Sequence, residues 1–196
     1  MPNLKGLTFK KTDVSQIINL EDIFGVSFAG EKSLRLAIAQ KVIDHIVKRT
    51  ESGESAFGGS FKPYSQDYKN TADFKLLKSG DNVDMKLTGA MLNDINLLSD
   101  SANTIRIGFE DELEKLKAFN HNTGDTVPRR QFFGISEREV KEVVMEDFSD
   151  DIARLEGRDP AKQTVKEIME QGVLRKALDI LNNQDNDFVF NTIEDL

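Results

Sequence analysis

The stretch from Asn103 to Glu139 constrains the fold most, because it combines signals for a strand, a short helix, a loop and a long helix. Apolar residues alternate with polar or small ones over 104–109, which is the period of a half-buried strand. Ser136 and Glu139 form an S-x-x-E capping box, which predicts that a long helix begins there and runs to about residue 156. The sequence therefore predicts a sheet and a helix that follow each other closely within one fold.

Between the strand and the long helix, the pattern predicts a charged helix over 110–119 and a polar surface loop over 120–128. Phe132 and Phe133 follow, and we expect them to pack against the sheet or the long helix. Arg129 and Arg130 come just before them. Two adjacent arginines can hold a phosphate or carboxylate, but a surface pair that bridges to acidic neighbours is the preferred interpretation. Both arginines are candidate residues of a partner or subunit interface.

Further secondary structure is predicted on both sides of this stretch. Apolar residues at helical spacing predict a helix over 32–50. Alternation over 82–87 indicates a second strand, and the apolar residues of 90–98 indicate a short helix after it. Asp159 and Pro160 have the order of an N-cap and a first helical residue, so another helix should begin there. A last strand or arm is indicated over 188–193.

These elements predict an α+β fold in which a small antiparallel sheet packs on long amphipathic helices. Residues 1–30 show no sustained period and are interpreted as an N-terminal arm. Residues 31–156 form the core domain, with a long loop inserted over 51–75. Residues 157–196 are interpreted as a helical C-terminal extension.

The inserted loop over 51–75 combines glycines and serines with several aromatic residues. Glycine and polar residues argue against a regular core element, yet a plain linker has little use for aromatic side chains. Two interpretations stay open, a loop folded back on its own domain and a segment that docks on a partner. If it docks on a partner or a second subunit, the candidate interface residues are Phe57, Phe61, Tyr64 and Tyr68.

The residue types argue against an enzyme and against a cofactor or metal site. There is no cysteine among the 196 residues, and the two histidines, His45 and His121, lie in different predicted elements. Phosphate-binding, dinucleotide-binding and zinc-protease motifs are absent from the sequence. The net charge of −8, from 26 basic and 34 acidic residues, disfavours a surface that grips nucleic acid. No apolar run is long enough for a membrane helix, so we expect a soluble protein.

Several segments in a fixed order resemble a known family. They are FKPYSQDY, VDMKLTGAML, TIRIGF, KAFNHNTG and PRRQFFGIS. In this order, after a long helix, they are similar to the bacteriophage virion-morphogenesis family of tail-completion and neck proteins. The resemblance covers residues 32–148 and leaves out the N-terminal arm and the C-terminal extension.

The resemblance implies a non-enzymatic structural role at the junction of phage head and tail. Relatives are α+β proteins that assemble into rings, so we expect a homo-oligomer, a hexamer or dodecamer, that contacts other neck, connector or tail-tube proteins. DNA would pass through the channel without specific binding, and the protein would lie in the virion after assembly in the bacterial cytoplasm. We expect a tail-completion or tail-terminator subunit. The alternatives are a head-completion (connector) protein and an assembly factor that is absent from the finished particle.

Overall fold

The computed structural model describes residues 4–78, 80 and 82–157. The chain divides into two compact units, Met1–Ile152 and Ala153–Leu196, a few residues before the boundary predicted at 156. The predicted helix after Asp159 and the strand over 188–193 lie outside the described residues. The first unit is an α+β fold with a small antiparallel sheet and long helices, which confirms the predicted fold class.

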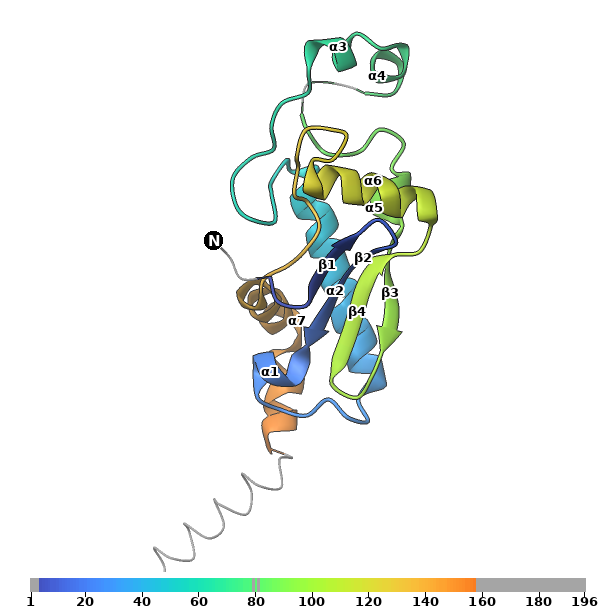
Figure 1. Cartoon of the computed structure of the whole chain (residues 1–196). Helices are drawn as coiled ribbons and strands as arrows, with labels where there is room; N and C mark the ends of the chain where they lie inside the picture. Colours follow the sequence, from blue (N-terminus) through green and yellow to red (C-terminus); the bar gives the residue numbers. More distant parts are fainter. Residues whose placement is uncertain (1–3, 79, 81, 158–196) are drawn as a thin grey trace, which may run out of the picture. The chain divides into compact units, whose positions relative to one another are not determined.

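The sheet has four strands in the order β1-β2-β4-β3, and every neighbouring pair is antiparallel (Figure 1). The predicted strand over 104–109 is confirmed as β4, which occupies an inner position of the sheet. The strands are β1 (Leu7–Lys10), β2 (Asp13–Asn19), β3 (Ile95–Asp100) and β4 (Thr104–Phe109).

The interpretation of residues 1–30 as an arm is wrong, because this segment supplies half of the sheet. β1 and β2 form a hairpin, and β2 pairs with β4 so that Gln16 lies opposite Ile107. The alternating pattern is hidden because Ser15 and Gln16 are polar and yet buried. A short helix, α1 (Leu20–Phe24), follows, and the Asn19 side chain caps its N-terminus.

The prediction for 82–98 is also wrong in its strand and in most of its helix. Within residues 82–87 the structure has no strand, and the helix is a single turn, α5 (Ala90–Asn93). The edge strand β3 follows over Ile95–Asp100, pairing with β4. The β-bulge between Leu97 and Ser99 interrupts the alternation of apolar and polar residues that would mark β3 as a strand in the sequence.

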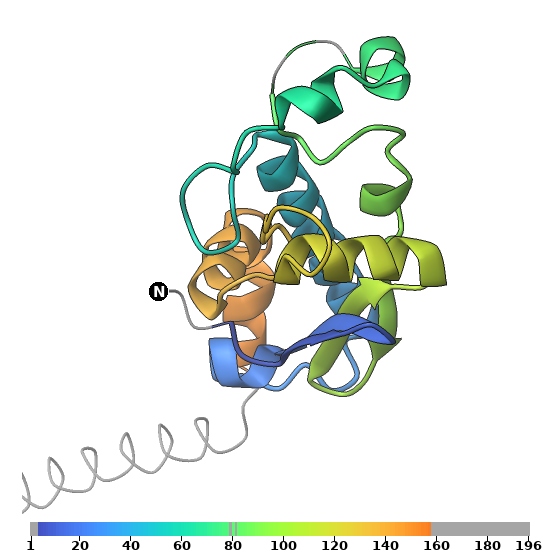
Figure 2. The same ribbon diagram turned by 45° about the horizontal axis from the view of Figure 1, so that its top comes forward.

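The three long helices of the described chain agree with the sequence. They are α2 (Lys32–Glu51), α6 (Glu112–Thr123) and α7 (Glu137–Gly157), with non-helical dihedral angles inside α7 at Phe148 (φ −122°, ψ 18°). α6 continues into the predicted loop as far as Thr123, where Gly124 ends it in a left-handed conformation. Helix α2 packs on β3 and β4, and α6 packs across the sheet (Figure 2).

The core lies on the sheet face that carries Ile105, Ile107 and Phe109, all nearly or fully buried. Helix α2 adds Ile38, Val42 and Ile46, which are fully buried as well. Gly108 is required in β4 by a close approach, because a Cβ there would lie 2.6 Å from the carbonyl oxygen of Val14. These apolar side chains alternate along β4 as the sequence predicted.

The segment over 130–136 lies within this core and is held by side chains from three different elements. The amide of Gln16 in β2 pairs with both backbone groups of Ile135, at 2.9 Å to the nitrogen and 2.8 Å to the oxygen. From α6, the Asn122 side chain accepts a hydrogen bond from the backbone nitrogen of Phe133 at 3.1 Å. An extended segment without a strand partner thus has its buried backbone groups satisfied by side chains.

Arg49 of α2 supplies the third side chain. Its Nη2 donates to the carbonyl oxygens of Phe132 and Gly134, at 3.0 Å and 2.6 Å, and its Nη1 donates to Glu139 at 2.8 Å. Gly134 has φ 119°, and a Cβ there would lie 2.9 Å from Leu4. The turn of the chain at Gly134 therefore favours glycine both by its backbone angle and by its contacts.

The capping box is confirmed at the start of α7. Glu139 accepts hydrogen bonds from the backbone nitrogen and the hydroxyl of Ser136, and the hydroxyl accepts from the Glu139 nitrogen. Burial alone raises the pKa of Glu139, but contact with His45, the Ser136 hydrogen bonds and the charge of Arg49 outweigh it and bring the pKa to about 2. His45 Nε2 lies 3.8 Å from Glu139, which is longer than a hydrogen bond. The capping carboxylate is thus ionised at neutral pH.

Candidate functional site

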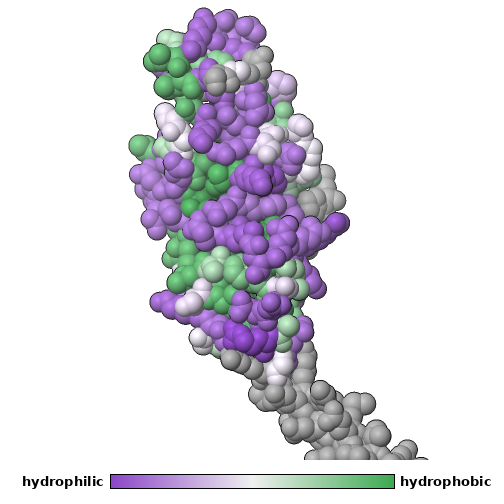
Figure 3. All heavy atoms as spheres, turned by 180° about the vertical axis from the view of Figure 1, so that it is seen from behind, coloured by the Kyte–Doolittle hydropathy of each residue, from purple (hydrophilic) through white to green (hydrophobic). Residues whose placement is uncertain are grey.

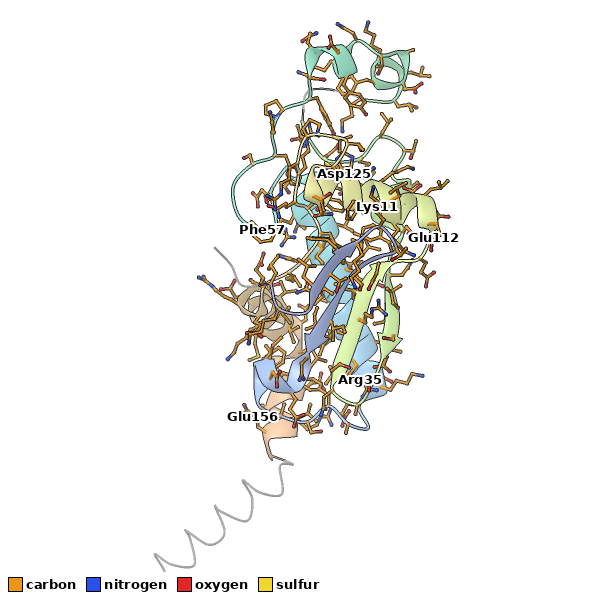
Figure 4. All side chains as sticks on the ribbon, viewed as in Figure 1. Lys11, Arg35, Phe57, Glu112, Asp125 and Glu156 are labelled. Carbon is orange, nitrogen blue, oxygen red and sulfur yellow. The ribbon has the colours of Figure 1, made fainter. Side chains whose placement is uncertain are left out.

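The first half of the inserted loop folds back on its own domain. The backbone nitrogen of Ala56 donates to the carbonyl oxygen of Gln131 at 2.8 Å, and that of Phe61 donates to Gly53 at 2.8 Å. Phe61 is only 7% exposed, so this candidate interface residue is part of the core. Phe57 is half-buried at the outer bend of the loop (Figure 4). Of these two phenylalanines, Phe57 is the one that retains surface for a partner.

The second half of the loop forms two short helices around an aromatic cluster. They are α3 (Gln66–Lys69) and α4 (Ala72–Leu77). The rings of Tyr64, Tyr68 and Phe74 contact one another, with centroids 5.2–5.5 Å apart. Lys78 lies over the Tyr64 ring and pairs with Asp84, which ties α4 to the following chain. The two tyrosines thus hold the loop together and are half-buried.

Arg129 and Arg130 have different environments, so the interpretation of both as a surface pair is wrong. Arg129 is exposed, and its Nε donates to the carbonyl oxygen of Asn122 at 3.3 Å. Arg130 is buried, donates to the carbonyl oxygens of Lys62 and Pro63, and lies 5.0 Å from the Tyr64 ring. The inserted loop covers the Arg130 guanidinium, which is the physical reason for its burial. Replacing both arginines by glutamate would therefore disturb the fold as well as any interface.

A pocket of about 460 Å³ lies beside this aromatic cluster. Tyr64, Tyr68 and Arg130 line it, so the structure brings three of the predicted site residues together. Phe57, Phe61 and Arg129 do not line it. The opposite wall comes from α6 and from the loop around α5, through side chains that the sequence analysis did not select. They are Met85, Leu87, Met91, Glu114, Lys117 and His121.

Two polar atoms in this pocket are buried without a hydrogen-bond partner in the described chain. They are Oε2 of Glu114 and Nδ1 of His121. The other carboxylate oxygen of Glu114 accepts from Lys117 at 2.7 Å. Buried polar atoms of a native protein normally have a partner, so these two atoms carry a desolvation cost, and both are shielded from the space of the pocket.

Met85 adds a strained backbone to the same pocket. With φ 57°, it is the non-glycine residue of the described chain that has a left-handed conformation. For a residue with a Cβ, this conformation costs on the order of 1–2 kcal/mol. Strain of this kind concentrates at binding sites. Cavity, unpaired polar atoms and strain therefore occur together at one site.

Burial, together with the positive charge of Arg130, lowers the pKa of His121 to about 4. In the unfolded chain the imidazole gains its proton near pH 6.5, whereas the folded protein resists protonation down to about pH 4. The unfolded state therefore binds more protons in this window, and acid favours it. We expect the free energy of unfolding to fall by up to about 3 kcal/mol between pH 7 and pH 4 through this group.

Urea denaturation at a series of pH values checks this expectation. A His121→Gln variant keeps a polar side chain but cannot titrate, so its stability should depend less on pH between 6.5 and 4 than that of the wild type. The same slope in the variant and the wild type over this window would show that His121 is not the titrating group.

The described residues show neither a metal cluster nor a nucleophile paired to a base at the pocket. Among residues 4–78, 80 and 82–157, no three histidine or acidic side chains cluster closely enough to hold a metal ion. A neutral imidazole and one carboxylate line the pocket, without a hydroxyl or thiol nucleophile paired to a base. Apolar walls with a few charged groups are suited to binding. No helix in the described part of the chain is long and apolar enough to cross a membrane.

Comparisons of the chain with protein-family models, with curated proteins and with solved structures gave no match.

Some residues with buried polar contacts could have been recognised from their positions in the sequence, although the sequence analysis did not select them. Arg35 and Arg49 occupy the buried stripe of α2, each two turns from Val42. A charged residue in an apolar stripe indicates a buried polar contact, and Arg35 indeed makes a bidentate pair with Asp100. Glu114 and Met85 gave no such signal, because the pocket joins segments that are far apart in sequence.

Proposed function

We propose that the chain is a structural subunit of a bacteriophage virion at the junction of head and tail, and that it acts without catalysis. In this proposal it is a tail-completion or tail-terminator subunit that forms a ring with further copies of itself. The order of sequence segments resembles the virion-morphogenesis family, and an α+β fold with a small sheet is what that resemblance implies.

The observation that carries the proposal is an exposed apolar surface on a well-anchored projection. Helices α3 and α4 extend beyond the sheet, α2 and α6 in both ribbon views (Figure 1, Figure 2). On α4, Leu76 is 82% exposed and Leu77 is 51% exposed. Figure 3 shows an apolar patch at this end of the first unit. Exposed leucines on an ordered projection are typical of a surface that another protein covers.

The charge supports a role around DNA without binding it. With a net charge of −8, the chain repels a polyanion on average, so DNA passing through a ring would not be held. Many basic residues of the described chain are paired with acidic ones, as in the pairs of Lys5 with Glu137 and Lys41 with Asp147. A protein that grips DNA needs several cations free for phosphate.

The protein content of purified virions tests the proposal. Particles purified by density gradient are separated on a gel, and the chain is identified by mass spectrometry and located with a specific antibody. We expect it in the particle, at the end of the tail next to the head. Its absence from intact particles would contradict the proposal and indicate an assembly factor, and labelling of the capsid vertex in tail-less heads would indicate a head-completion protein.

A further inference from the structure

The pocket described above lacks complementary groups within its own chain. Arg130 is buried, and its hydrogen-bond acceptors are backbone carbonyl oxygens, with no carboxylate paired to it in the described residues. A buried guanidinium attracts a carboxylate. The pocket therefore fits a ligand that has an apolar body and a negative charge.

Helix α4 carries this combination on its exposed surface. Leu76 and Leu77 supply the apolar part, and Asp73 is exposed beside them. Asp73 lies three and four residues before the two leucines, so it shares their side of the helix. These three residues are called the α4 tip below.

The tip is anchored to its own chain by ring contacts, an ion pair and a hydrogen bond. Phe74 is 7% exposed and packs against Tyr64 and Tyr68. At the end of α4, the Lys78 side chain pairs with Asp84 and donates to the carbonyl oxygen of Lys86 at 3.1 Å. A preorganised apolar surface loses little conformational entropy when it is covered.

We propose that the α4 tip of one copy docks into the pocket of the next copy. The leucines lie against Met85, Met91 and the neighbouring apolar wall. Asp73 approaches the cations of the pocket, Arg130 and Lys117. The docking rests on the proposed function, because it assigns the contact through which a ring of subunits forms.

In this proposal the contact joins two copies and is head-to-tail. Leu76 is 82% exposed in the single chain, so its own pocket does not cover it. The tip and the pocket are different surfaces, so each copy offers one of each. Such heterologous contacts generate closed rings when the rotation between neighbours closes, and filaments otherwise.

A mixing experiment with two variants tests the docking. The tip variant carries Leu76→Asp with Leu77→Asp, and the pocket variant carries Thr126→Trp, which fills the mouth from an exposed position on the pocket lining. The matched control is Leu113→Asp, which removes a leucine on α6 that is 68% exposed and does not line the pocket. All four proteins are measured as full chains by light scattering after size exclusion, with circular dichroism as a check on folding.

We expect the wild type and the control to self-associate alike. Each interface variant alone should need at least about 100-fold higher concentration, since each buried leucine contributes about a tenfold factor or more. Mixed in equal amounts, the two variants retain one intact contact, between the tip of the pocket variant and the pocket of the tip variant. The mixture should therefore stop at a heterodimer.

Other results overturn the docking. Folded interface variants that assemble like the wild type would show that the copies use another surface, while the proposed function would stand. A wild type that stays monomeric at every concentration would overturn the contact between copies, and the presence of the chain in virions would still decide the proposed function separately.

Discussion

Replacement of Arg49 by methionine is expected to lower the free energy of unfolding by about 3–5 kcal/mol. Methionine keeps much of the volume of the Arg49 side chain, which is 7% exposed, but removes its guanidinium. Its loss leaves Oε1 of Glu139 and the carbonyl oxygens of Phe132 and Gly134 without the Arg49 donor. A buried charge that loses its partner costs more than the pair itself contributed. Chemical denaturation at neutral pH measures the change.

Lys48→Met is the matched control, because Lys48 precedes Arg49 in α2 and is exposed. This change should alter the stability by no more than about 0.5 kcal/mol. Adding Glu139→Gln to Arg49→Met should cost less than the sum of the two single changes, since one contact joins them. A loss below about 1 kcal/mol for Arg49→Met would show that the arginine does not hold the segment over 130–136.

Phe133→Ala is expected to destabilise the protein by a similar amount, about 3–5 kcal/mol. The Phe133 ring is fully buried, and its centroid lies 5.2 Å from that of Phe109 in β4. Truncation opens a cavity between the sheet and the segment that crosses its inner face. Thermal unfolding followed by circular dichroism, together with urea denaturation, measures the loss.

Phe57→Ala serves as the comparison, because it removes the same side chain from a half-buried position. We expect a clearly smaller loss in the free energy of unfolding, under about 1.5 kcal/mol. The neighbours of Phe57 do not enclose its side chain, so truncation leaves no closed cavity. Equal losses in the two variants would mean that the packing of Phe133 on β4 does not organise the fold.

The parts of the fold that depend on local pattern were predicted from the sequence. β4 shows strict alternation, α2 shows helical spacing, and the Ser136–Glu139 box marks the start of α7. Each of these signals lies within one element, so a single stretch of sequence is enough to recognise it.

The elements that were missed depend on distant partners. Strand β2 places Ser15 and Gln16 in buried positions, and Gln16 is buried because it pairs with the backbone of Ile135. Most of strand β3 was predicted as helix, because the spacing of its apolar residues is compatible with a helix as well as a strand. Pairing with β4 favours the strand. Tertiary contact decided these cases against local propensity.

The candidate site was predicted only in part for the same reason. The aromatic residues of the inserted loop marked the region, and Tyr64, Tyr68 and Arg130 do meet at the pocket. Burial of Arg130 could not be anticipated, because it results from the loop folding over it. The wall formed by Met85 and α6 depends on the fold as a whole.

We propose that the chain is a subunit that assembles at the junction of head and tail. The most direct measurement is electron microscopy, with native mass spectrometry, of the purified chain incubated with tails assembled without it. We predict closed rings of a single size, a hexamer or dodecamer, seated at the head-proximal end of the tail. Monomers alone in the presence of intact tails and capsids would contradict it.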